Sequence, residues 1–233
     1  FLIKKVIYGG KFTSKDTLFR IFLFRLFNKI ETWQLLEKKV GLVTLKNFNF
    51  ERYSKALEEI KLSRPIYGNA FILCANKAFG YYKKHENHLG LLCFVFKKSK
   101  NIDGLLVAKS LKELFGTLKS FPLMGNFMSY QIAVDFNYSE VFDFDENDFT
   151  VAGPGAERGI RKCFLNTSGK DSEYTIQYMV SNQDKEFERL GIKFRDLWGR
   201  PMHAIDCQGW FCETDKYSRV KFPELKSNRV KIK

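Results

Sequence analysis

The sequence lacks any long, uninterrupted apolar run. Its most apolar stretch, residues 21–27, contains Arg25 and is flanked by Arg20 and Lys29, far short of the roughly 20 apolar residues that a membrane-spanning helix requires. We therefore expect a soluble protein with no membrane partner. The sequence also begins at Phe1 instead of Met, so we expect a missing N-terminal piece, for which a removed targeting sequence is one explanation.

The sequence lacks a paired set of cysteines. They are odd in number and unrelated in spacing, which predicts no disulfide framework and an intracellular, reduced compartment. Whether that compartment is nuclear, cytoplasmic or organellar stays open. His85, His88 and Cys93 lie close in sequence, but no second cluster completes a zinc site, so we predict no metal and no cofactor. The five cysteines are Cys74, Cys93, Cys163, Cys207 and Cys212.

Acidic residues are scarce relative to basic ones. The 26 Asp and Glu residues oppose 39 Lys and Arg residues, which leaves a formal charge of +13. Such a surplus favours a polyanionic partner, either nucleic acid or an anionic membrane surface. A lysine-rich compositional bias is the alternative explanation. With 45% apolar and 16% aromatic residues, the chain can form one large core or two closely joined lobes.

Helical periodicity dominates the sequence. Thr13 and Ser14 precede a dense apolar segment, which predicts a buried core helix to about Lys38. Residues 50–62 and 105–118 show the spacing of amphipathic helices. Residues 66–78 and 89–96 fit either short strands or buried helical turns. We therefore expect an all-α, mainly helical fold, in which a small β element within residues 66–96 remains open.

The predicted organisation is one helical domain followed by a short tail. Residues 1–220 are expected to form a single domain of two closely packed lobes, and residues 221–233 a basic C-terminal tail. Within the domain, residues 135–148 contain six acids and no Lys or Arg. Such a run predicts a solvated connection between helices.

Residues 118–131 predict a helix, a tight turn and a second helix. Gly125 and Asn126 would begin the second helix, where free backbone N–H groups and the positive helix end favour a phosphate. The segment resembles the hairpin of helix-hairpin-helix DNA glycosylases, with Pro122 and Gly125 in the register of its Pro-x-x-Gly. Leu123 stands where that hairpin usually has its first glycine. An ordinary turn between two helices is the alternative interpretation.

A second turn, in residues 151–162, combines glycines with cations. Gly153, Pro154 and Gly155 predict a rigid turn with outward N–H groups. Three cations follow within the next helical turns, so we predict a phosphate-binding cradle. A tight corner that needs glycine only for its backbone conformation is the alternative. The three cations are Arg158, Arg161 and Lys162.

The third segment, residues 206–219, places charged and aromatic side chains at near-helical steps. Asp206, Glu213 and Lys216 can share one helix face, while Trp210 and Tyr217 pack or stack nearby. Such a face fits either a buried ion-pair network or an active centre.

Taken in order, four segments resemble one family. These segments are residues 24–33, residues 122–131, residues 152–159 and residues 206–219. Together they resemble the alpha-glutamyl/putrescinyl thymine pyrophosphorylase-like family, also described as the helical domain of hydroxymethyl-deoxyuridine DNA kinases.

The resemblance implies a helix-hairpin-helix glycosylase-like fold that acts on a thymine-derived base in DNA. Members of the family transfer an amine or amino acid onto an activated base and release pyrophosphate. In this sequence the resemblance implies catalytic roles for Asp206, Glu213 and Lys216, with Gly153, Gly155 and Arg158 near the pyrophosphate. It also implies a base pocket formed by Asn28, Gln208 and Tyr217.

Two departures from the expected pattern shape the functional prediction. Gly209 replaces a larger polar residue, and residues 151–160 contain no Asp, which disfavours base excision. The predicted function is therefore nucleic-acid binding related to DNA base-modifying transferases. The alternative is a catalytically inactive structural subunit of a large ribonucleoprotein such as an organellar ribosome. The partner is DNA by resemblance, with RNA and a larger assembly as open alternatives.

Overall fold

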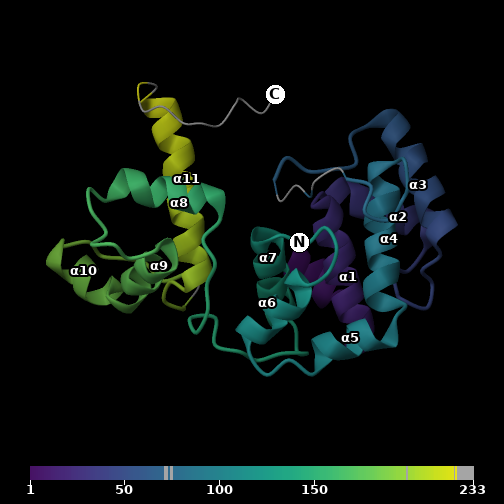
Figure 1. The fold of residues 1–233 in the computed structure, drawn as a ribbon, viewed down its shortest axis with the longest axis horizontal. Helices are drawn as coiled ribbons and strands as arrows, with labels where there is room; N and C mark the ends of the chain where they lie inside the picture. The colour runs from purple at the N-terminus through teal and green to yellow at the C-terminus, as the bar shows by residue number, and fades with distance from the viewer. Residues whose placement is uncertain (71–72, 74–75, 198, 223, 225–233) are drawn as a thin grey trace. The chain divides into compact units, whose positions relative to one another are not determined.

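The computed structural model shows an all-α protein, as the sequence predicts (Figure 1). It describes all residues except 71–72, 74–75, 198, 223 and 225–233, and no described residue lies in a strand. The small β element is therefore not found in the described part of residues 66–96, where residues 84–96 are helical; residues 71–72 and 74–75 lie outside the described residues. The chain divides into two compact units, Phe1–Phe144 (unit 1) and Asp145–Lys233 (unit 2).

Unit 1 is built around one buried helix, α1. Ten of its fourteen residues are buried, and it contacts the N-terminal helix η1 as well as α4 and α7. The predicted cap is confirmed, because Thr13 Oγ1 accepts a hydrogen bond from the backbone N–H of Asp16 at 3.2 Å. The helices of unit 1 are η1 Leu2–Ile7, α1 Ser14–Phe27, α2 Ile30–Val40, α3 Phe50–Ser63, α4 Lys84–Phe96, α5 Ser99–Leu106, α6 Leu111–Lys119 and α7 Asn126–Asn137.

Two predicted helices are each interrupted. The core helix does not continue to Lys38, because Asn28 adopts a left-handed conformation with φ 45° and separates α1 from α2. The predicted helix over residues 105–118 is also wrong. Residues 107–110 separate α5 from α6, and Ser110 Oγ caps α6 by accepting from the N–H of Glu113. In both cases the helical spacing of apolar residues continues across the break, so the sequence pattern does not reveal where the helix ends.

Other local predictions in unit 1 hold. The amphipathic helix predicted for residues 50–62 is α3, which ends before Arg64 and buries Tyr53, Leu57 and Ile60. The acidic run is different, because its first member, Asp135, is buried in α7 instead of lying in a solvated connection.

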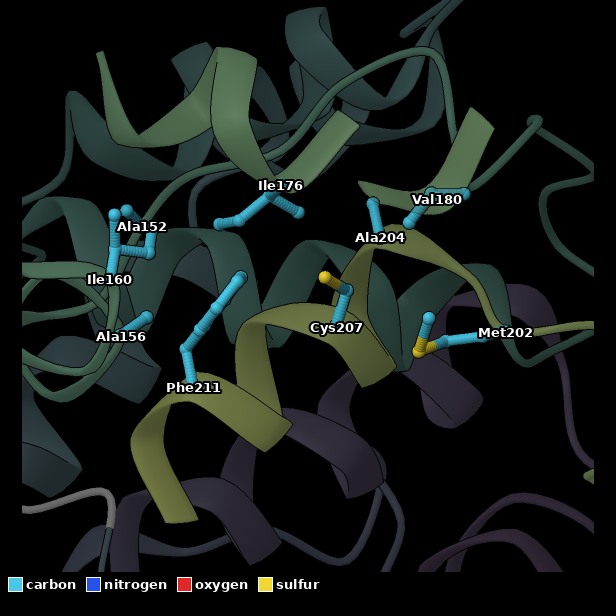
Figure 2. Close-up of a cluster of buried hydrophobic side chains, with 9 residues drawn as sticks. All are labelled: Ala152, Ala156, Ile160, Ile176, Val180, Met202, Ala204, Cys207 and Phe211. Atoms are coloured by element: carbon cyan, nitrogen blue, oxygen red, sulfur yellow. The ribbon is translucent and has the colours of Figure 1, made fainter. Parts of the chain in front are cut away.

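Unit 2 contains α8 Pro154–Cys163, α9 Ser172–Ser181, α10 Gln183–Arg189 and α11 Ala204–Lys221. Helix α11 contacts both α8 and α9. The apolar core of unit 2 joins these helices (Figure 2). It consists of Ala152, Ala156, Ile160, Ile176, Val180, Met202, Ala204, Cys207 and Phe211. The predicted tail falls almost entirely on residues outside the described part of the chain. Close packing of two lobes within residues 1–220 stays a prediction.

No helix in the described ranges is both long and apolar enough to cross a membrane.

Candidate functional site

The helix, turn and helix predicted for residues 118–131 are α6, residues 120–125 and α7. Two buried side chains, Phe121 and Met124, anchor the turn, and the N–H of Met124 donates to the carbonyl of Phe121 at 3.2 Å. Leu123 has φ 67°, the left-handed conformation that glycine adopts without strain. The structure thus shows a glycine-type backbone at the position where the hairpin that this segment resembles in sequence has glycine.

Gly125 is the N-cap of α7 and has ordinary extended dihedrals, φ −87° and ψ 169°. A Cβ atom added there would meet nothing within 4 Å, so neither backbone strain nor close packing requires glycine. Gly125 and Asn126 are both exposed. No side chain of the described residues caps the start of α7, the position at which helix N–H groups favour a phosphate.

Exposed cations line the helix that precedes this turn. Lys112 and Lys119 lie seven residues apart on α6, which places them on one face. Both are exposed, and neither forms a salt bridge within the described part of the chain. The ammonium of Lys119 lies 5.8 Å from the centre of the Phe115 ring. We call Lys112, Lys119 and the turn residues 120–126 the hairpin surface.

Asn28, predicted for a base pocket, takes part in a polar network of unit 1. Its Oδ1 accepts from Arg25, and its Nδ2 donates to the carbonyl of Ala70 at 3.3 Å. Arg25 directs its Nε and a terminal nitrogen to Asp135. Burial raises the pKa of Asp135, an effect that the Arg25 guanidinium opposes. The network ties the end of α1 to α7.

The Gly153-Pro154-Gly155 turn begins α8, with Gly153 as N-cap and Pro154 in the first turn, where proline fits without losing a hydrogen bond. The glycines that follow serve close packing. A Cβ atom on Gly155 would overlap the sulfur of Cys212, and one on Gly159 would lie 2.6 Å from the carbonyl carbon of Phe211. Their spacing of four residues places both on the α8 face that meets α11.

The cations of α8 separate into two groups. Arg158 and Lys162 both turn towards Asp215 of α11, at 3.1 Å and 2.8 Å, whereas Arg161 is exposed. Arg219 also approaches Asp215, at 3.5 Å. Burial by itself would raise the pKa of Asp215, but hydrogen bonds from Lys162 and Arg158 outweigh it, and the pKa is lowered.

The predicted catalytic residues lie on α11 but do not converge. Asp206 accepts from the N–H of His203 at the helix start and forms a salt bridge with Arg200 at 2.6 Å. Glu213 pairs with Lys216 on an exposed surface. Because Asp206 and Glu213 are seven residues apart, their positions differ by about 10 Å along the axis.

A shallow, open hollow lies over the middle of α11. Glu213 lines it together with three neighbours, and neither Asp206 nor the Gly153-Pro154-Gly155 turn takes part. The two predicted base-pocket residues of this helix also separate, because Gln208 is buried while Tyr217 is exposed. The hollow is lined by Trp210, Glu213, Thr214 and Tyr217.

The sequence profile of the helical domain of 5-hmdU DNA kinase matches residues 1–227. The chain belongs to this family. This membership confirms the resemblance that the four sequence motifs indicate. A curated relative, the 5-hmdU DNA kinase of Bacillus phage SP10, is 23% identical over 222 residues, which cover 88% of this chain and 34% of the relative. The chain thus spans about a third of that relative's length. No solved structure matches.

In this helical domain, two of the motifs form one structural unit. Residues 152–159 supply the glycines and Arg158, and residues 206–219 supply the helix that they contact. Sequence reasoning did not assign a role to Asp215, which joins the two motifs, or to Arg219. The available signal was the spacing of four residues that both Arg158–Lys162 and Asp215–Arg219 share.

Proposed function

We propose that this helical domain binds the DNA backbone during base modification, and that unit 1 supplies most of the attraction. The observation that supports this proposal is the uneven distribution of charge. Unit 1 holds 23 Lys and Arg against 12 Asp and Glu, an excess of 11 positive charges. Unit 2 holds 16 Lys and Arg against 14 Asp and Glu, an excess of only two positive charges.

A cationic unit attracts nucleic acid because neutralised phosphates release their counterions. The hairpin surface offers two kinds of phosphate contact, namely the ammonium groups of Lys112 and Lys119 and the start of α7, which no side chain of the described residues caps. Contacts of these kinds position a protein on DNA but read little sequence. We therefore expect binding that depends strongly on salt and weakly on base sequence.

DNA as the partner follows from the family. The relative from phage SP10 is named for its action on DNA that contains 5-hmdU, and the present chain matches its helical portion. By extension, the substrate of the modification system to which this chain contributes is DNA with a modified thymine-type base.

A transferase reaction on that base is the finer part of the proposal. It would use Asp206, Glu213 and Lys216, of which Glu213 alone lines the hollow beside Trp210 and Tyr217. Glu213→Gln keeps the shape of the side chain and removes the carboxylate, so it should abolish turnover and preserve DNA binding. Unchanged turnover would contradict the catalytic role.

The alternative, an inactive structural subunit of a ribonucleoprotein, draws support from the separation of Asp206 and Glu213. A binding titration distinguishes the alternatives by comparing three duplexes of one sequence: thymine DNA, 5-hydroxymethyluracil DNA and RNA. We expect similar affinity for both DNA duplexes and a steep loss of affinity as salt rises. Absence of DNA binding at low salt, or about tenfold tighter binding of RNA, would contradict the proposal.

A further inference from the structure

Asp215 on α11 is surrounded by three cations from two helices. Lys162 Nζ lies 2.8 Å from Oδ1, whereas Arg158 Nε and Arg219 Nε lie 3.1 Å and 3.5 Å from Oδ2. The Asp215 side chain is 1% exposed, and those of the cations are 15–28% exposed. The carboxylate is thus fully enclosed, while part of each cation still reaches solvent.

The cluster carries more positive charge than Asp215 can neutralise. Three cations face one carboxylate, which leaves a surplus of two positive charges. The carboxylate of Glu213 does not reduce this surplus, because it pairs with Lys216. Residues 145–224 as a whole are slightly acidic, so the surplus is a local property of the α8–α11 contact.

The arginines of this cluster also keep unused donors. Arg158 and Arg219 both direct Nε towards Asp215, and their terminal nitrogens form no hydrogen bond with any described residue. Arg219 Nε is buried and likewise lacks a hydrogen-bond acceptor in the described ranges. The planar fork of a guanidinium group matches two oxygens of a phosphate.

A purely structural arginine-carboxylate pair in the same protein looks different. In unit 1, Arg25 faces Asp135 one to one and spends its remaining terminal nitrogen on Asn28 Oδ1, at 3.0 Å. That pair has no surplus charge. One cation would neutralise Asp215, so charge balance does not explain why two further cations lie beside it.

We propose that Arg158, Lys162 and Arg219 form a binding site for phosphate groups, with Asp215 as the positioning residue that holds them together. A free phosphate dianion, or two neighbouring phosphodiester groups of DNA, would neutralise the surplus of two charges and accept from the free guanidinium nitrogens. The site deepens the phosphate-binding role expected for Arg158 and Lys162. It does not depend on DNA binding by unit 1.

The phosphate has two possible sources: a free anion such as inorganic phosphate or pyrophosphate, and the DNA backbone, whose phosphodiester groups carry one negative charge each. Calorimetry on the full chain at constant ionic strength tests the first, with inorganic phosphate and pyrophosphate as probes and chloride as the reference. Anisotropy titrations with a DNA duplex test the second. The variant is Arg219→Gln, and Arg195→Gln is the matched control, because Arg195 is an exposed arginine of unit 2 with no contact to Asp215.

We expect Arg219→Gln to weaken binding of pyrophosphate or of DNA by about tenfold or more, the effect of losing one charge-assisted contact. Arg195→Gln should bind both probes as the wild type does. Loss of pyrophosphate binding alone identifies a free anion as the ligand, and loss of DNA affinity identifies the backbone. If Arg219→Gln fails to fold, Arg219→Lys replaces it, since it keeps the charge and removes the fork.

Two results would overturn the site. One is a wild-type protein that binds neither phosphate nor pyrophosphate and a folded Arg219 variant with unchanged DNA affinity. The other is an equal loss of affinity in the Arg195 control, which would indicate general surface charge. Failure of DNA binding by unit 1 is a separate result, because it would appear with the hairpin-surface lysines and not with Arg219.

Discussion

Gly159 of α8 faces the backbone of Phe211 of α11 so closely that no side chain fits between them: an added Cβ atom would lie 2.6 Å from the carbonyl carbon of Phe211. Helices α8 and α11 therefore meet through glycine. Four residues earlier, Gly155 meets Cys212 in the same way. This contact also places Arg158 and Lys162 beside Asp215.

The first prediction concerns this glycine. Gly159→Ala should lower the free energy of unfolding by about 1–3 kcal/mol, the usual cost of overpacking, because the obstructing atoms belong to backbone. Gly209→Ala is the matched control, since Gly209 lies inside α11 with nothing within 4 Å of an added Cβ. It should raise stability by about 0.5–1 kcal/mol. Denaturant titration of both variants checks the prediction, and equal effects would contradict the packing account.

The second prediction concerns Leu123, whose φ of 67° strains any residue with a Cβ atom by about 1–2 kcal/mol. Replacement by glycine relieves the strain, whereas replacement by alanine retains it. Leu123→Gly should therefore be more stable than Leu123→Ala by about 1 kcal/mol, the reverse of the usual order in a helix. Thermal unfolding of the pair measures the difference. A less stable glycine variant would show that the backbone is not left-handed there.

The third prediction uses the N-cap position of Gly125. Asp and Asn cap helices equally well, so Gly125→Asp and Gly125→Asn should both match or exceed the stability of the wild type. Only the aspartate would repel a phosphate at the start of α7. DNA affinity should fall with Gly125→Asp and fall much less with Gly125→Asn. If the aspartate variant binds DNA like the asparagine variant, the hairpin does not contact phosphate.

The fourth prediction is a pH dependence that arises from Asp215. Its pKa is lowered from 3.8, so the folded state holds the charged form more strongly than the unfolded chain does. The resulting stability is present above the unfolded pKa and is lost as pH falls through the folded value. Asp215→Asn should be less stable than the wild type at neutral pH, and this difference should shrink below about pH 3.8. Urea titrations at several pH values test it. A difference that stays constant with pH would contradict the ion cluster.

The sequence predicts local features of the fold well. The cap at Thr13, the buried face of α3 and the two helices of the hairpin depend on residues within one or two helical turns. All of them appear in the structure.

Features that depend on distant partners are the ones that sequence reasoning misses. At the break between α1 and α2, the Asn28 side chain donates to the carbonyl of Ala70, 42 residues away. The buried Asp135 accepts from Arg25, 110 residues away. Likewise, the sequence around the glycines of α8 predicts a phosphate-binding turn, and only the structure shows that Gly155 and Gly159 pack against α11. The local sequence shows only one of the three cations around Asp215, Arg219, because the other two lie 53 and 57 residues earlier.

The salt dependence of DNA affinity tests the central claim, that the positive unit 1 binds the DNA backbone. The measurement compares Lys112→Gln/Lys119→Gln in the hairpin surface with Lys185→Gln/Lys193→Gln, which removes two exposed lysines of unit 2. The slope of log K against log salt is negative, and each lost phosphate contact should make it less steep by about 0.9. We predict a slope that is less steep by about 1–2 for the unit 1 variant and an unchanged slope for the unit 2 variant. Equal slopes for both variants and the wild type would contradict the account.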